Sequence, residues 1–363
     1  MVTILFSSLI LLLPLINPIQ GVEEDFNQCG RFSPTGEYTY FCALYVRTEK
    51  SSIFLGGGTM IQRNQILSLA TLFTNFKILG EGSSCDGYSP KYSLFARCGG
   101  KDLQVTREET TEPSSLDRPI QKIFLHPSYN NRSLTNDYAI LITTEPFQYS
   151  SKLGRVCLPH PGESETDIFT KDCQAIGHGK DGEDLFDNFY SSLLRKVDLS
   201  VVKSEDCEEI LNTKHFQNFS LGGADNSWRW KIDESFLCAG GVAGLDTCEG
   251  DGGGPLLCKR FDVQEVLADS GLNATFFQVG VTAWGVGCGR SIPGVYSRIF
   301  IAICWIKQVM QCYPGEENLP DLDNSGGLID LRNEQDSVDT CGQPESCGCT
   351  TESQENLFEL RID

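Results

Sequence analysis

The sequence predicts an all-β protein. From about residue 36 to residue 296 it consists of short alternating or apolar runs, such as FCALYV, DYAILIT and FQVGVTAW, separated by clusters of glycine, proline, asparagine and aspartate. Runs of this length and spacing favour a barrel or a sandwich of antiparallel strands. One helix is expected, in IFIAICWIKQVMQC (299–312), where apolar residues recur at helical spacing. We expect it to dock one face on the sheets.

The length and the amino-terminal segment suggest a secreted chain of one or two compact domains. With 363 residues and 40% hydrophobic content, the chain can bury one large core or two small ones. Residues 1–21 form an apolar run that Pro14 and Pro18 interrupt. These prolines, and the lack of a flanking basic stop, favour a signal peptide over the alternative, a membrane anchor. An arm (22–35), the β-rich body (36–312) and an acidic, cysteine-containing extension (313–363) follow.

Sixteen cysteines, with no CxxC pairs at metal-site spacing, indicate disulfides formed in an oxidising compartment. We therefore expect a secreted, extracellular protein with no metal site and no cofactor. Three glycosylation sequons begin at Asn131, Asn218 and Asn273, and would place those loops at the surface.

The formal net charge of −20 argues against binding to nucleic acid or to an anionic membrane, because both need a basic face. Thirteen Asp or Glu against two Arg in residues 313–363 contribute −11 of it. That extension is expected to be flexible, with a disulfide tether whose partner stays open. Its segment DLDNSGG resembles the start of a calcium loop, but the twelfth position is Arg332 instead of a carboxylate.

The stretch DTCEGDGGGPLLC (246–258) and the later AWGVGCGRSIPGVYSRI carry the most specific pattern in the chain. Further motifs in the same order are GGGTMI, HPSYN, NDYAIL, VCLP and FLCAGG. Together these motifs resemble the trypsin and chymotrypsin family over about residues 30–312. The resemblance implies two six-stranded antiparallel Greek-key β-barrels, trypsin-like, with a C-terminal helix.

The resemblance also implies an inactive member. The family needs a hydroxyl nucleophile, an imidazole base and a carboxylate that orients the imidazole. Asp137 takes the place of the carboxylate, but Thr71 stands at the position of the histidine and Gly252 at that of the serine. Threonine cannot act as a base near neutral pH, and glycine has no nucleophile. The four histidines are not positioned to replace the base: His126, His160, His178 and His215.

Three further departures from the family pattern agree with lost catalysis. Gly56 and Leu72 replace the cysteine pair that braces the histidine loop, and Ala283 replaces the serine that contacts the catalytic acid. An activation stretch of the IVGG type is missing, so Asp251 lacks the amino terminus that it pairs with in the family. We expect a pocket that is zymogen-like or stabilised in another way.

The resemblance implies four disulfides, Cys173–Cys258, Cys207–Cys238, Cys248–Cys288 and Cys29–Cys157. It also suggests a fifth, Cys42–Cys98, because these two cysteines fall on strands that are neighbours in the family fold. Cys304 and Cys312 cannot bond each other, because eight residues of helix separate them by about 12 Å. The partners of these two and of Cys85, Cys341, Cys347 and Cys349 stay open.

The specificity pocket of trypsin-like members also has its counterparts, since Asp246 matches the carboxylate that holds a substrate Arg or Lys, and Gly285 and Gly294 match the glycines of an open pocket. It is either a retained site for a basic side chain or a collapsed vestige. The missing activation pair favours the vestige.

Among members with glycine at the nucleophile position, the chain resembles arthropod homologues related to prophenoloxidase-activating factors. This implies a non-catalytic cofactor of an extracellular protease cascade in innate immunity and melanisation, with proteases, zymogens or prophenoloxidase as partners. Only VEEDFNQ separates the apolar run from Cys29, so we expect no clip domain. The alternatives are a venom-type decoy inhibitor and a haptoglobin-like carrier or adhesion protein. An insertion with Trp228 and Trp230 offers contacts for partners or packs on itself.

Overall fold

The computed structural model describes residues 29–30, 38–48, 51–99, 108–109, 117–161, 169–182, 190–213, 229–260 and 276–313. The predicted signal peptide, most of the arm and all but the first residue of the acidic extension lie outside these ranges, as do His215, Asn218, Trp228 and Asn273. Within the described ranges, no helix is long and apolar enough to cross a membrane.

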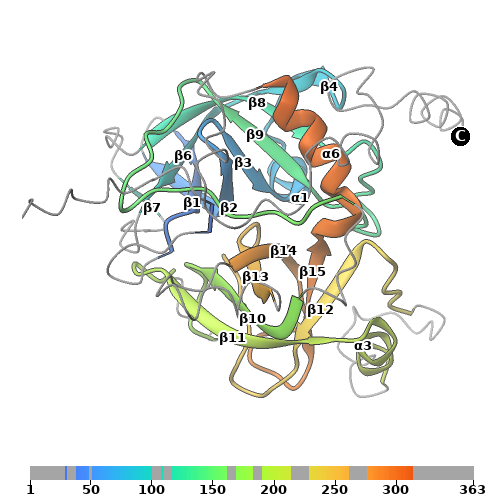
Figure 1. The fold of residues 1–363 in the computed structure, drawn as a ribbon. Coiled ribbons are helices and arrows are strands. Elements are labelled where there is room, and N and C mark those ends of the chain that lie inside the picture. The colour runs from blue at the N-terminus through green and yellow to red at the C-terminus, as the bar shows by residue number, and fades with distance from the viewer. Residues whose placement is uncertain are drawn as a thin grey trace, which may run out of the picture.

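The first half of the chain forms a closed six-stranded antiparallel barrel (Figure 1). Around the ring its strands are β1 (Phe41–Arg47), β2 (Ser52–Gln62), β3 (Gln65–Ser68), β9 (Ala139–Thr143), β8 (Asp117–Leu125) and β6 (Ser93–Cys98). Pairing of β6 with β1 closes the ring. A hairpin of β4 (Leu79–Ser83) and β5 (Gly87–Pro90) pairs with β8, and β7 (Glu108–Glu109) pairs with β2.

The second half forms another closed six-stranded antiparallel barrel, below the first in Figure 1. Its strands, in ring order, are β10 (Phe169–Gly177), β11 (Arg195–Val202), β12 (Phe236–Gly240), β15 (Pro293–Arg298), β14 (Phe276–Trp284) and β13 (Pro255–Arg260). Pairing of β13 with β10 closes it. The predicted fold class, two six-stranded Greek-key barrels with a C-terminal helix, is therefore confirmed.

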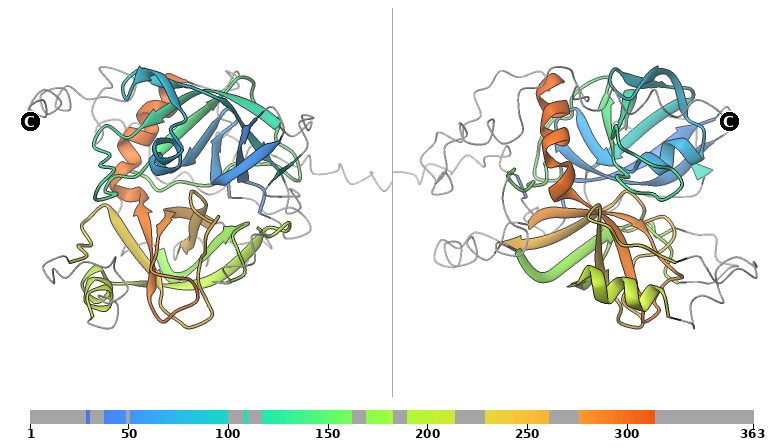
Figure 2. Two further views of the ribbon diagram at one scale, coloured as in Figure 1. Left: turned by 180° about the vertical axis from the view of Figure 1, so that it is seen from behind. Right: turned by 90° about the vertical axis from the view of Figure 1, so that its right-hand side faces the viewer.

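The helix α6 (Ile299–Cys312) has the predicted bounds and packs along the first barrel (Figure 2). Its buried face, which includes Ile299, Ile303 and Ile306, belongs to the same apolar cluster as the interior of that barrel. Gln65 Nε2 on β3 donates to the carbonyl of Tyr313 at 2.7 Å, which fixes the end of the helix. Because α6 follows β15 directly, it ties the second barrel to the first.

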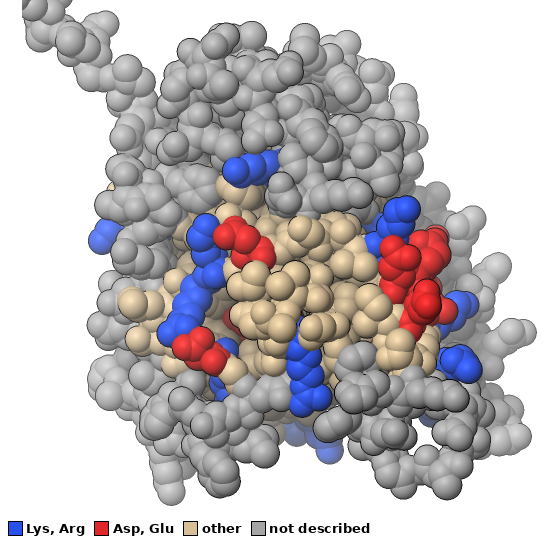
Figure 3. Space-filling view, turned by 90° about the horizontal axis from the view of Figure 1, so that it is seen from below, with Lys and Arg blue, Asp and Glu red and all other residues tan. Residues whose placement is uncertain are grey.

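The expectation of a single helix was wrong, since α1 (Ala70–Asn75) and α3 (Ser204–Leu211) are also present. With six residues, α1 is too short to show helical periodicity. The sequence of α3 does carry a signal: two acidic residues in its first turn, and Cys207 and Leu211 buried four residues apart. Figure 3 shows the underside of the second barrel, where acidic side chains gather on the side of α3.

Five disulfides join described cysteines: Cys29–Cys157, Cys42–Cys98, Cys173–Cys258, Cys207–Cys238 and Cys248–Cys288. Each is expected to stabilise the fold by about 2–4 kcal/mol. Cys42 and Cys98 are directly opposed on the paired strands β1 and β6, so this bond lies at the closure of the first barrel.

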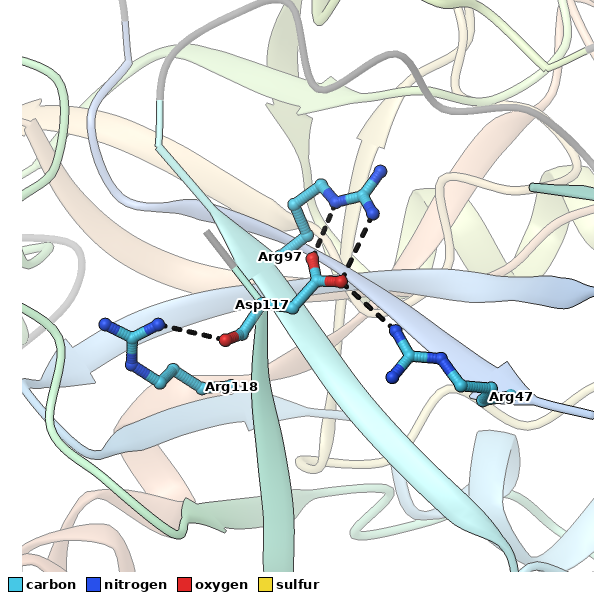
Figure 4. A network of polar contacts seen from close by, with 4 residues as sticks. All are labelled: Arg47, Arg97, Asp117 and Arg118. Atoms are coloured by element: carbon cyan, nitrogen blue, oxygen red, sulfur yellow. Dashed lines mark hydrogen bonds and ion pairs between the residues drawn. The ribbon is translucent and has the colours of Figure 1, made fainter. Parts of the chain in front are cut away.

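A buried charge network lies at the same closure (Figure 4). Asp117 on β8 accepts from Arg97 Nε on β6 at 2.8 Å and from an Arg47 guanidinium nitrogen on β1 at 3.3 Å. Its side chain is 4% exposed and that of Arg97 is 10% exposed. The backbone carbonyl of Asp117 accepts from Arg118. One carboxylate therefore links three neighbouring strands, and removing it would leave Arg97 buried without this carboxylate partner.

Candidate functional site

Asp137, the residue that we expect at the position of the catalytic acid, is buried just before β9, beside α1. Its two carboxylate oxygens accept from Thr71, one from the backbone N–H at 2.8 Å and the other from the hydroxyl at 2.6 Å. Burial raises the pKa of Asp137 to about 6, although the hydrogen bonds from Thr71 oppose the shift. The Thr71 hydroxyl thus satisfies the carboxylate.

Tyr129 completes this arrangement and was missed by the sequence reasoning. Its hydroxyl lies 2.9 Å from Thr71 Oγ1 and 3.2 Å from Thr74 Oγ1. Tyr129 belongs to the HPSYN motif, but the motif alone does not indicate that its hydroxyl contacts α1, and only the fold shows this. Thr71 is held between a carboxylate and a phenol, and neither neighbour gives it an imidazole's ability to accept and release a proton.

Gly252, the residue that we expect at the position of the nucleophile, lies in the tight turn before β13. Its carbonyl accepts from the backbone N–H of Gly57 at 2.8 Å, which joins the two barrels at this point. A Cβ atom at Gly252 would lie 4.0 Å from Leu69 Cδ1 and from the Thr282 carbonyl, which is ordinary van der Waals contact. Its φ is also outside the positive range that favours glycine.

The next residue, Gly253, shows the opposite behaviour. It has φ +85°, and a Cβ atom there would lie 2.2 Å from the carbonyl oxygen of Gly57. The turn therefore requires glycine at 253 but not at 252. Nothing in the packing or the backbone explains why the nucleophile position has no side chain.

Two other departures from the family pattern are close to these residues. Leu72 lies against Gly56, with Leu72 Cδ1 3.1 Å from where a Cβ of Gly56 would stand. The leucine thus occupies the space beside the residue that its cysteine counterpart would bond. Ala283, on β14, has only a methyl group and cannot donate a hydrogen bond to Asp137.

Asp251 is half-buried, and its side chain accepts two backbone N–H groups, from Gly179 at 2.7 Å and from Cys248 at 2.8 Å. Burial raises its pKa to about 6, and the negative charge of Asp246 adds to the shift. A Cβ on Gly179 or on Gly177 would meet this carboxylate at 2.5 Å or closer. Among the described residues, two backbone N–H groups bind the Asp251 carboxylate, which in the family pairs with the ammonium group of the new amino terminus.

The structure brings Asp246 and Gly294 together: a Cβ on Gly294 would lie 3.5 Å from Asp246 Oδ1. Asp246 Oδ2 accepts from the backbone N–H of Gly289 at 3.0 Å. Among the described residues, a Cβ on Gly285 would meet only the Gly287 carbonyl, at 3.8 Å, so these residues leave the space above Gly285 open.

Two pairs of aromatic rings pack together near these residues. Trp230, from the insertion, stacks on Trp284 at the end of β14 with ring centroids 4.6 Å apart. Tyr190 packs edge-on against Phe54, at 5.0 Å, and a Cβ on Gly250 would lie 2.6 Å from its ring. Trp230 therefore packs on the body of the protein.

The described histidines have other roles. His126 is half-buried and packs against Tyr138 and Trp305, with centroid distances of 5.6 and 5.0 Å, and partial burial lowers its pKa to about 4. His178 is fully buried, and its Nδ1 lies 2.7 Å from the Ser191 carbonyl. His160 is exposed.

These positions can be compared with known proteins. The family profile described as Trypsin matches residues 28–306, most of the chain. The chain belongs to the trypsin family.

Three relatives are similar over most of the chain. An inactive CLIP domain-containing serine protease A28 of Anopheles gambiae is 29% identical over 79% of this chain and 65% of the relative. An inactive CLIP domain-containing serine protease A3 of Aedes aegypti is 30% identical over 76% of this chain and 49% of the relative. Phenoloxidase-activating factor 2 of Galleria mellonella is 31% identical over 71% and 72%. The chain thus spans about half to two thirds of the length of the two inactive relatives.

Proposed function

We propose that this trypsin-family chain is a secreted, catalytically inactive homologue that regulates an extracellular serine protease cascade by binding proteins. The observation that carries the proposal is the pair Thr71 and Gly252: the site has neither an imidazole nor a nucleophile, while both barrels and five disulfides are intact. A trypsin-like fold without these catalytic groups is still suited to binding other proteins.

The chemistry of acyl transfer supports the absence of catalysis. The reaction needs an oxygen or sulfur nucleophile and a base that removes its proton. Gly252 offers no such atom, and the Thr71 hydroxyl donates to Asp137 instead of accepting a proton from a nucleophile. Both carboxylate oxygens of Asp137 accept hydrogen bonds from Thr71, and Gly252 offers this carboxylate no hydroxyl to deprotonate.

The names of the relatives support the kind of cascade. Two relatives are named inactive CLIP-domain serine proteases and a third a phenoloxidase-activating factor. We propose that the partners are proteases, zymogens or prophenoloxidase of the pathway that leads to melanisation.

The test is to add the purified mature protein to a reconstituted prophenoloxidase cascade, with and without a clip-bearing homologue, and to follow phenoloxidase activity. An increase supports a cofactor, and a decrease supports a decoy that competes with the clip-bearing protein. No change at saturating protein overturns the proposal and favours a carrier or adhesion role.

A matched control is the variant Gly252→Ser, which adds a hydroxyl where the structure has room for it. If the protein acts only by binding, this variant shifts phenoloxidase activity as much as the wild type does. A larger effect of the variant, abolished by a covalent serine reagent, would mean that catalysis contributes.

The sequon at Asn131 is proposed as a glycosylation site. Asn131 is exposed, in the turn that follows Tyr129. The secreted protein should lose one enzymatically removable glycan in the variant Asn131→Gln, as measured by mass. An unchanged mass would contradict the assignment.

A further inference from the structure

The loop that follows β12 carries an exposed apolar turn, formed by residues 242–245 with the sequence VAGL. All four residues are exposed, Val242 by 59% and Leu245 by 46%. A run of exposed apolar side chains lowers solubility, so such runs on natural surfaces commonly serve binding. The apolar turn is therefore a candidate docking surface.

The apolar turn has a fixed shape. The Leu245 N–H donates to the Val242 carbonyl at 3.0 Å, and these two residues form an antiparallel bridge, which directs both side chains to one side. Gly244, with φ +83°, donates its N–H to the carbonyl of Gly289 at 2.7 Å. A partner would thus meet a surface that is already ordered, which lowers the entropic cost of binding.

The two loops that meet at this turn have no charge of their own. The turn lies in GGVAGL (240–245), and the loop that it contacts is WGVGCG (284–289). The disulfide Cys248–Cys288 joins the loops at the lower end of the second barrel in Figure 1. Figure 3, which views this end from below, shows an area without charged side chains in the middle and charged side chains around it. An apolar centre with a polar rim is the usual layout of a protein–protein interface.

The unbalanced charge of the rim is acidic. Beside the disulfide, Lys180 pairs with Glu249 at 2.6 Å, and the Glu249 side chain is 65% exposed against 13% for Lys180. Arg290, which follows the second loop, is half-buried and already has an interaction partner. The helix α3 has four acidic residues and no basic one, and none of the four has an ion-pair partner among the described residues. Charge complementarity therefore favours a basic partner.

We infer that the apolar turn docks a basic protein, with Val242 and Leu245 in an apolar recess of that protein and its Lys or Arg side chains against α3. The inference rests on the proposed function, in which the chain acts by binding proteins. A second copy of the chain is a poorer occupant, because the formal charge is −20, of which residues 313–363 contribute −11 and the rest −9. The same charge disfavours an anionic membrane.

Binding of the full-length secreted protein to three purified probes tests the inference: prophenoloxidase, a protease zymogen of its cascade and a clip-bearing homologue. Val242→Ser with Leu245→Ser removes the two apolar side chains, and Ala243→Glu instead adds a charge to the middle of the turn. Each change should weaken binding of a recognised probe by at least about tenfold, measured by surface plasmon resonance.

The matched control is Phe76→Ser, which removes an exposed apolar side chain at the end of α1 and should leave the affinity unchanged. All of these variants should keep the urea unfolding midpoint of the wild type, because the replaced side chains are exposed.

The charge of the rim is tested by Glu205→Lys with Glu209→Lys on α3. This variant should associate with the recognised probe about tenfold more slowly at low salt, and its association rate should depend less on salt concentration. An unchanged association rate would contradict a basic partner.

The outcomes separate the inference from the proposed function. Wild-type affinity in both turn variants overturns the inference and leaves the proposed function in place. If the wild type binds none of the three probes, the proposed function fails and the inference fails with it. A wild-type dimer in sedimentation that the turn variants dissociate, or binding to phosphatidylcholine vesicles that they lose, would assign the turn to another occupant and overturn the inference.

Discussion

The pair of neighbouring glycines at 252 and 253 allows a quantitative prediction. In Gly252→Ser the new Cβ has nearest neighbours at 4.0 Å and an ordinary φ, so the native state accepts it. Replacing a glycine at a compatible site reduces the entropy of the unfolded chain, which contributes about 0.4–1 kcal/mol of stability. We expect the free energy of unfolding of this variant to exceed that of the wild type by no more than about 1 kcal/mol.

In Gly253→Ser the same side chain meets the Gly57 carbonyl oxygen, 2.2 Å from Cβ, at φ +85°. The left-handed conformation alone costs roughly 1–2 kcal/mol for a residue with a Cβ. The overlap has to be relieved by moving backbone, which also strains the contact between the two barrels. A total loss of about 3 kcal/mol or more is expected.

The assay is urea unfolding of both variants, followed by tryptophan fluorescence, together with hydrolysis of Arg and Lys ester substrates. Gly252→Ser should remain at background activity because Thr71 supplies no base. Equal destabilisation by the two substitutions would refute the reasoning about the turn. Turnover by Gly252→Ser that a serine reagent blocks would refute the reasoning about the site.

Two further predictions concern buried charge. Burial raises the pKa of Asp137 and Asp251 to about 6, so between about pH 4 and 6 the folded state holds protons that the unfolded state has released. The part of the unfolding free energy that these two groups contribute should therefore fall as the pH rises through that window. Asp137→Asn should remove about half of this fall, measured by urea unfolding at each pH. The same pH dependence in the variant as in the wild type would contradict the raised pKa of Asp137. Asp117→Ala should destabilise the fold by about 3–5 kcal/mol because it leaves Arg97 buried. The control variant Asp181→Ala removes an exposed carboxylate, and its free energy of unfolding should stay within about 0.5 kcal/mol of the wild type. Similar losses of stability in Asp117→Ala and Asp181→Ala would show that burial does not set the size of the loss.

Much of the fold could be predicted from local patterns. The bounds of α6 followed from apolar spacing, because a helix of fourteen residues repeats its buried face several times. The same spacing cannot identify α1, whose six residues contain fewer than two turns. The barrels were expected only through ordered motifs, because strand pairing joins residues far apart in the chain.

The site divides in the same way. The sequence by itself determined which chemical groups are missing, because the absence of an imidazole at 71 and of a hydroxyl at 252 is a matter of residue identity. Only the tertiary structure decided which contacts these residues make instead. Thr71 bonds to Asp137 and Tyr129, and backbone N–H groups bind Asp251. The tertiary structure also showed that the turn needs glycine at 253 but not at 252. These contacts depend on distances between segments brought together by two closed barrels, and such distances are not encoded in any single stretch of sequence.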